Sequence, residues 1–207
     1  MARCYLVLGG SSGIGEDVAA SGRWPVQLAV ALRDTGVALD DPHIIATTGW
    51  TTDELEAGID ADAPQGPFDL VSLLIGVNDQ YRGRSVDDYR PRFTALLQRA
   101  LGFADGRARR VLVLSIPDWG VTPFGIASGR DREQIGQALD AYNAAAAAIC
   151  AEHEVTFIDI TDLSRDYGGE AAMLAADGLH PSAAMYTLWH QRAYAVARVH
   201  LADEGAH

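Results

Sequence analysis

The amino-acid sequence predicts an α/β fold with three layers, in which helices cover both faces of a parallel β-sheet. Short apolar segments alternate along the whole chain with longer segments of helical periodicity, which is typical of a parallel sheet. These apolar segments are nearly continuous, as in strands that are buried on both faces. No repeat, low-complexity tract or linker divides the 207 residues, so we expect a single domain over residues 1–207.

Five apolar segments are predicted to form the strands. They are residues 3–8, 43–47, 68–75, 110–116 and 155–160. Right-handed crossovers leave few arrangements for five parallel strands, so we expect the flavodoxin-like strand order 2-1-3-4-5.

Five helices are predicted between and after these strands. They begin near Pro25, after Thr51 or Thr52, after the capping box at residues 85–88, before Ile135, and after Ser182. Pro91 lies in the third of them and is expected to kink that helix or delay its start. The residues after the fourth strand, 117–129, are expected to form a long loop.

Composition excludes several classes of function. The net charge of −12 argues against nucleic acid or an anionic membrane surface as a partner. Cys4 and Cys150 have no paired spacing and are expected to be buried apolar residues rather than a disulfide or a metal site. The first apolar segment is too short for the core of a signal peptide, and none could span a bilayer, so we expect a cytoplasmic protein.

A glycine-rich stretch, residues 9–15, follows the first strand and allows two interpretations. One is the dinucleotide-binding turn of short-chain dehydrogenases, carried by Gly13-Ile14-Gly15. The other is a nucleophile turn that presents Ser11 as an exposed side chain at the carboxyl end of the strand. The chain contains no lysine, which both the dehydrogenase Tyr-x-x-x-Lys motif and a P-loop require. The absence of lysine therefore disfavours nicotinamide chemistry and favours the nucleophile.

Polar residues and a glycine follow four of the predicted strands. They are Ser11, Gly49, Asn78, and the pair Asp177 and His180. Each could be an ordinary turn residue, and Gly49 could simply supply a positive φ. The carboxyl ends of parallel strands meet at one edge of the sheet, however, so these residues are expected to lie together.

The spacing of Asp177 and His180 lets the carboxylate orient the imidazole, which can then take a proton from a serine. The backbone N–H groups of Ser11 and Gly49 and the side-chain amide of Asn78 would bind the oxyanion that forms. Together, these residues predict nucleophilic ester chemistry.

In these motifs the sequence resembles the SGNH (GDSL-like) hydrolase superfamily. The matching motifs are Gly9-x-Ser11, Gly49, Gly76-x-Asn78-Asp79 and Asp177-x-x-His180-Pro181. The resemblance spans nearly the whole chain. It implies a serine esterase, a carboxylic ester hydrolase, with Ser11, His180 and Asp177 as the catalytic triad. It implies Ser11, Gly49 and Asn78 as the oxyanion hole, and neither a metal nor an organic cofactor.

The family resemblance leaves alternatives open. Members of this family also act as acyltransferases, and a non-catalytic module that binds esters or glycans is a further alternative. Gly10 stands where the family usually has aspartate, which is expected to loosen the placement of Ser11. Gly10 could instead occupy a positive-φ turn. The same departure leaves Ser12 as a second candidate nucleophile.

Candidate substrate-binding residues follow the strands as well. Four aromatic residues are predicted to lie on loops at the edge of the site, namely Trp50, Tyr81, Trp119 and Phe124. Arg82 and Arg84 could meet an anionic group on the substrate. The chain has no lid-sized insertion except residues 117–129, which favours small soluble esters as substrates. Nothing in the sequence predicts an oligomeric state.

Overall fold

A computed structural model describes residues 2–203 of the chain. Its sheet contains five parallel strands in the order β2-β1-β3-β4-β5, which confirms the predicted fold class and strand order. The strands are β1 (Tyr5–Gly9), β2 (His43–Ala46), β3 (Leu70–Leu74), β4 (Val111–Leu114) and β5 (Thr156–Ile158).

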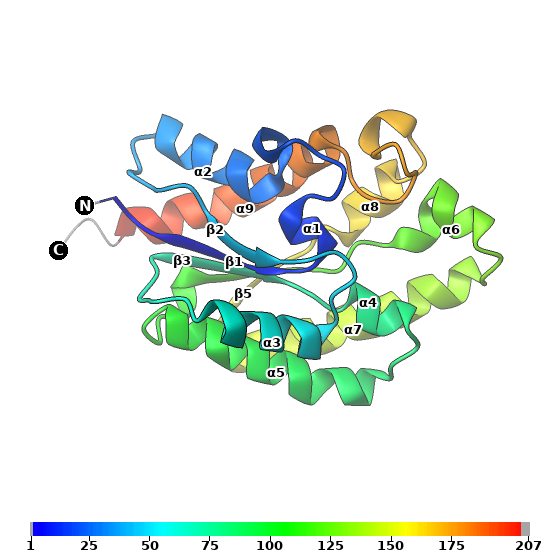
Figure 1. The fold of residues 1–207 in the computed structure, drawn as a ribbon, viewed down its shortest axis with the longest axis horizontal. Helices are drawn as coiled ribbons and strands as arrows, with labels where there is room; N and C mark the ends of the chain where they lie inside the picture. The colour runs from blue at the N-terminus through cyan, green and yellow to red at the C-terminus, as the bar shows by residue number, and fades with distance from the viewer. Residues whose placement is uncertain (1, 204–207) are drawn as a thin grey trace.

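The five predicted long helices are present and form the two outer layers. Helices α2 (Trp24–Asp34) and α9 (Ala183–Asp203) cover one face of the sheet. Helices α3 (Thr52–Asp62), α5 (Val86–Phe103) and α7 (Arg132–Glu152) cover the other face (Figure 1). The arrowheads of the strands point to the edge that carries α1, α4 and α6, whereas α9 ends at the opposite side of the molecule.

The strands are buried on both faces because alternate side chains enter different hydrophobic clusters. In β1, Leu6 and Leu8 pack toward α3, α5 and α7, whereas Tyr5 and Val7 pack toward α2 and α9. This two-sided burial explains why the strands are continuous apolar segments in the sequence. It also fixes the strand ends, and therefore the loops that follow them.

The structure differs from the predicted helices in three respects. Helix α5 begins at Val86 and continues through Pro91, so a delayed start is wrong. Ser85 caps this helix by accepting a hydrogen bond from Asp88 N, and the buried Tyr89 and Phe93 anchor it, which offsets the one hydrogen bond that Pro91 cannot donate. Short helices were not predicted: α1 (Ser11–Ile14), α4 (Val77–Tyr81) and α8 (Thr161–Tyr167), and 3₁₀ turns at Ala20–Gly22, Ala108–Arg110 and Ala171–Met173. The expected loop of residues 117–129 contains a 3₁₀ turn, Trp119–Val121, and helix α6 (Pro123–Ala127).

The two cysteines lie in different environments. Cys150 is buried, as predicted, whereas Cys4 is exposed. The prediction for Cys4 is wrong because β1 begins only at Tyr5, so Cys4 precedes the covered part of the sheet. Its backbone N–H bonds the Asp69 carboxylate instead of another strand.

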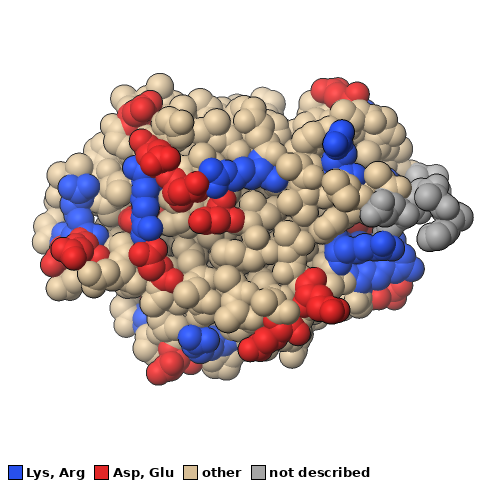
Figure 2. Space-filling view, turned by 180° about the vertical axis from the view of Figure 1, so that it is seen from behind, with Lys and Arg blue, Asp and Glu red and all other residues tan. Residues whose placement is uncertain are grey.

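The described residues contain no helix that is both long and apolar enough to cross a membrane. On the face shown in Figure 2, acidic and basic side chains lie beside each other, with uncharged surface between them. No continuous basic patch covers this face, in keeping with the charge of the chain.

Candidate active site

A cavity of about 270 Å³ opens at the carboxyl edge of the sheet. Ser11, Gly49, Asn78 and His180 all line it, although they follow different strands. The structure therefore brings together four of the five residues singled out for catalysis. The fifth, Asp177, is hydrogen-bonded to His180.

Ser11 is the first residue of α1, directly after β1 and Gly10. Backbone hydrogen bonds close this turn: Gly13 N and Ile14 N both donate to Gly10 O, at 2.9 and 3.2 Å. A Cβ on Gly9 would lie 2.8 Å from Leu74 O. Only glycine at this position therefore lets β1 lie this close to β3. The Ser11 residue is only 6% exposed, so the expectation of an exposed serine is wrong, although Ser11 reaches the cavity. Ser12 is equally buried and lines the same cavity.

Gly10 has a φ of −113°, so the alternative of a positive-φ turn at this position is wrong. A Cβ there would lie 3.6 Å from Trp50 O and 3.8 Å from Asn78 Nδ2, which are ordinary contact distances. The backbone would therefore accept the aspartate that the family usually has. Because Gly10 has no side chain, the turn has no side-chain cap.

Asp177 and His180 lie on the turn that precedes α9. The Asp177 Oδ2 to His180 Nδ1 distance is 2.5 Å, and Asp177 Oδ1 accepts from the backbone N–H groups of Leu179 and His180. Burial alone would raise the pKa of Asp177, but these hydrogen bonds outweigh burial, so its pKa lies below the usual value. An ionised Asp177 holds the Nδ1–H tautomer, which makes Nε2 the proton acceptor.

Among residues 2–203, no hydrogen bond joins Ser11 to His180, and His180 Nε2 has no partner. In the described residues the two side chains thus share the cavity without a hydrogen bond between them. Hydrogen bonds between a nucleophile and its base often form only when substrate is bound.

Gly49 lies on the loop after β2, and Asn78 lies in the short helix α4 after β3. Gly49 has a φ of +84°, a conformation that favours glycine, so it is both a turn glycine and a lining residue. Asn78 lies in α4 and donates one Nδ2 hydrogen to Trp50 O at 3.0 Å. An amide nitrogen carries two hydrogens, so one remains for a ligand.

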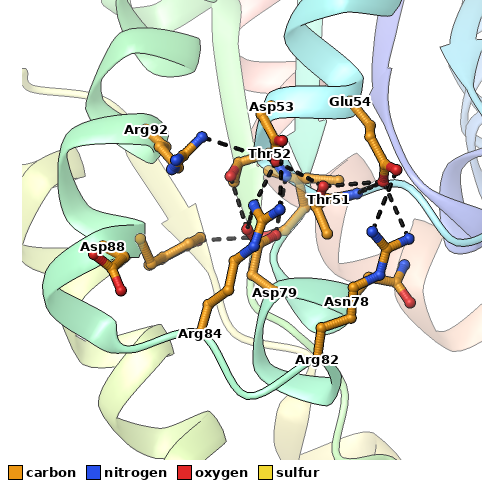
Figure 3. A network of polar contacts seen from close by, with 12 residues as sticks. Thr51, Thr52, Asp53, Glu54, Asn78, Asp79, Arg82, Arg84, Asp88 and Arg92 are labelled. Carbon is orange, nitrogen blue, oxygen red and sulfur yellow. Dashed lines mark hydrogen bonds and ion pairs between the residues drawn. The ribbon is translucent and has the colours of Figure 1, made fainter.

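A network of charged and polar side chains holds the Gly49 loop and α4 together (Figure 3). Asp79 is fully buried and accepts from the backbone and hydroxyl of Thr52, at 3.0 and 2.8 Å, and from Arg84 at 3.0 Å. Arg84 also pairs with Asp53, and Arg82 pairs with Glu54. Both arginines are thus held by carboxylates of the protein, and neither is among the described residues that line the cavity.

The aromatic candidates separate into two groups. Tyr81, Trp119 and Phe124 line the cavity, and Trp119 contacts the other two rings edge-on, with centroids 5.3 and 6.3 Å apart. Trp50 is not among the described residues that line it. Its ring packs against Gly58 of α3, where an added Cβ would lie 2.2 Å from the indole. Trp50 contributes its carbonyl to the site, not its ring.

Sequence reasoning missed Asp118, a buried residue that lines the cavity. Its carboxylate accepts from Gly120 N and from Arg165 Nε, at 2.9 and 3.0 Å, and holds the start of the segment that carries Trp119. Asp118 follows β4, so the rule that selected Ser11 and Asn78 would also have selected it. In the described part of the chain, no three His, Cys, Asp or Glu residues cluster as metal ligands.

Comparisons with known proteins agree with this architecture. Residues 7–188 match the GDSL-like Lipase/Acylhydrolase family. No curated protein matches the chain.

Solved structures share the fold at low sequence identity. The crystal structure of TesA is similar, with a TM-score of 0.74, 20% identity and coverage of 96% of this chain and 99% of that one. The psychrotrophic esterase EstA from Pseudoalteromonas sp. has a TM-score of 0.72, 16% identity and coverage of 95% and 97%. A mutant of Axe2, an acetyl-xylooligosaccharide esterase from Geobacillus Stearmophilus, has a TM-score of 0.69, 18% identity and coverage of 94% of each chain.

The family match extends over the segments that form the sheet and reaches the start of α9, and it contains all five catalytic candidates. The chain therefore belongs to the GDSL-like lipase/acylhydrolase family, a family of ester hydrolases.

Proposed function

We propose that the protein is a serine esterase that hydrolyses small carboxylic esters through an acyl-enzyme on Ser11. The observation that carries this proposal is the single cavity shared by Ser11, Gly49, Asn78 and His180, with Asp177 bonded to the far side of the imidazole. Nucleophile, base, orienting acid and oxyanion donors are all required for acyl transfer, and this edge of the sheet supplies each of them.

In the first half-reaction, His180 Nε2 takes the Ser11 hydroxyl proton as Oγ attacks the ester carbonyl. The negative charge that develops on the carbonyl oxygen is stabilised by the Ser11 and Gly49 backbone N–H groups and by the free Asn78 N–H. Collapse of the tetrahedral intermediate breaks the bond to the alcohol, which leaves with the proton from His180. Asp177 keeps the imidazole oriented and stabilises its charged form.

In the second half-reaction, His180 removes a proton from a water molecule that attacks the acyl-serine. The same donors stabilise the second oxyanion, and the proton returns to Ser11 as the acid leaves. The protein thus acts on two similar transition states with one set of groups, and neither step requires a metal or an organic cofactor.

The size of the cavity supports small substrates. Its volume of about 270 Å³ lies just below the roughly 300–1,000 Å³ of pockets that hold drug-sized ligands. Tyr81, Trp119 and Phe124 give one wall an apolar surface suited to an acyl or aryl group. Acetyl and other short-chain esters fit this description best.

Turnover of p-nitrophenyl esters of increasing acyl length tests the proposal, with acetylated sugars and acyl-CoA alongside. We expect hydrolysis of short esters that is independent of NADPH and falls about a millionfold in Ser11→Ala. Ser12→Ala is the matched control and is expected to retain activity. Activity that survives in Ser11→Ala but not in Ser12→Ala would show that Ser12 is the nucleophile. A wild-type protein that turns over none of the esters would favour the alternative of a non-catalytic binding module.

A further inference from the structure

No side chain or backbone atom packs against the side-chain position of Gly49. Gly49 has a φ of +84°, and no heavy atom lies within 4 Å of the position that a Cβ would occupy. Glycine is the residue with the largest backbone freedom, and open space around it removes steric restraint. The carbonyl groups of this loop, by contrast, have side-chain partners that can hold the loop in place.

Two side chains hold consecutive carbonyl groups of this loop. Arg82 Nη2 donates to Gly49 O at 2.7 Å, and Asn78 Nδ2 donates to Trp50 O at 3.0 Å. The donors are four residues apart at α4, and Arg82 N donates to Asn78 O at 3.0 Å. Two residues one helical turn apart thus hydrogen-bond to two consecutive carbonyl groups of the Gly49 loop.

Arg82 is itself anchored at its far end. Its guanidinium contacts both Glu54 oxygens at 3.2 Å, and Glu54 Oε2 accepts from Thr51 N at 2.9 Å as part of the α3 cap. The Thr51 N–H, followed by the Arg82 guanidinium, lowers the pKa of Glu54, so its charge is present at neutral pH. Figure 3 shows the guanidinium directed at Glu54, above the helix that carries Asn78.

We propose that Arg82 is a positioning residue of the oxyanion hole, which holds the Gly49 carbonyl and thereby keeps the loop that carries the Gly49 N–H in place. A planar guanidinium can hold the carbonyl and the carboxylate at once, whereas an ammonium offers a single point charge. The inference rests on the proposed function, because it assigns Gly49 N–H to the oxyanion. It adds Arg82, which is not among the described residues that line the cavity, to the groups that the reaction depends on.

The test compares Arg82→Ala and Arg82→Lys with the control Arg92→Ala. Arg92 is a half-exposed member of the same network, 3.9 Å from Asp53, and among the described residues it forms no hydrogen bond to the Gly49 loop. For each protein we would measure kcat and KM on a short p-nitrophenyl ester, the melting temperature, and inhibition by phenylboronic acid. The tetrahedral serine adduct of the boronic acid places an oxygen in the oxyanion hole.

We expect Arg82→Ala to lower kcat about tenfold with little change in KM, less than the loss of a direct oxyanion donor. The inhibition constant of the boronic acid should rise by a similar factor. Arg82→Lys should recover part of the loss, and Arg92→Ala should match wild type.

Equal kcat values in Arg82→Ala and wild type would overturn the proposal. A higher KM and a lower melting temperature in Arg82→Ala, with boronate inhibition unchanged, would also overturn it. That result would indicate that Arg82 supports the structure or substrate binding instead. Failure of the proposed function is separate: the wild-type protein itself would then show no turnover, or Ser11→Ala would remain active.

Discussion

The two halves of the candidate active site are held in place by different forces. The nucleophile half, around Ser11, is closed by backbone hydrogen bonds and by the close approach of Gly9 to β3, without a side-chain cap. The oxyanion half, around Gly49 and Asn78, is open around the glycine and is held by side-chain hydrogen bonds and ion pairs. One half depends on the absence of side chains and the other on their presence.

This difference indicates which kind of substitution should disturb each half of the site. A steric change at a glycine should disturb the nucleophile turn, because an added Cβ meets backbone atoms that cannot move aside. Removal of a charge should disturb the oxyanion loops, because Asp79 is buried and would lose an ionic partner. The predictions below follow from this contrast, from the largest effect to the smallest.

The first prediction compares the base that activates the nucleophile with a donor of the oxyanion half, by rate. His180→Ala removes the base and should lower kcat about a millionfold, whereas Asn78→Ala removes one of three oxyanion donors and should cost about 10²–10³. Steady-state kinetics on a short p-nitrophenyl ester measure both. Equal losses in the two variants would mean that Asn78 does more than bind the oxyanion.

The second prediction compares the halves by stability. Arg84→Ala should lower the free energy of unfolding by about 2–3 kcal/mol, because the Asp79 carboxylate stays buried with only Thr52 as donor. Gly9→Ala should cost about 1–3 kcal/mol through steric strain against Leu74 O. Urea unfolding at low salt measures both penalties. Repeating it at about 1 M NaCl weakens the exposed Arg84–Asp53 pair and leaves both the buried Arg84–Asp79 pair and the steric penalty of Gly9→Ala nearly unchanged. A Gly9→Ala penalty that shrinks with salt would contradict the contrast.

The third prediction concerns acid pH in the oxyanion half. The hydrogen bond from Arg84 is the main reason that the pKa of Asp53 lies well below its usual value. A depressed carboxyl pKa contributes stability that is fully present above the unfolded value, about 4, and is lost as the pH falls toward the folded value. The melting-temperature difference between wild type and Asp53→Asn should therefore shrink below pH 4. A difference that stays constant down to pH 2 would show that Asp53 does not contribute through its charge.

The smallest expected effect is that of Gly10→Asp, which gives the nucleophile turn the side chain it lacks. The φ of −113° is negative, and Cβ contacts of 3.6 Å or more mean that a Cβ fits at this position. A better-held Ser11 should raise kcat about threefold and change KM less, because the gain acts in the transition state. An unchanged melting temperature with unchanged or lower kcat would indicate that backbone bonds already hold Ser11 rigidly.

The fold and the placement of the catalytic candidates could be predicted from sequence because both follow from strand ends. Buried parallel strands are continuous apolar segments, and the residues after them must meet at one edge. Ser11 and Asn78 are predictable for this reason, whereas His180, which lies well beyond the end of β5, is predictable from its spacing to Asp177. Helices α4 and α6 are not, because five residues make fewer than two turns and show no periodicity.

Side-chain contacts between segments far apart in the chain could not be predicted from the sequence either. Arg82 and Gly49 are 33 residues apart, and nothing in either residue indicates that one holds the other. An exposed arginine near a site suggests an anionic ligand until the carboxylate beside it is seen. The direction of the Trp50 ring likewise depends on the open position left by Gly58 on the neighbouring helix.

The most direct test of the central claim is to trap the nucleophile with a p-nitrophenyl phosphonate and locate the adduct by mass spectrometry. The account predicts one phosphonyl group per chain, on Ser11, in wild type and in Ser12→Ala, and none in Ser11→Ala. Fragment ions that separate Ser11 from Ser12 decide between the neighbouring serines. An adduct on Ser12, or ester hydrolysis that continues undiminished without any adduct, would contradict the assignment of Ser11 as the nucleophile.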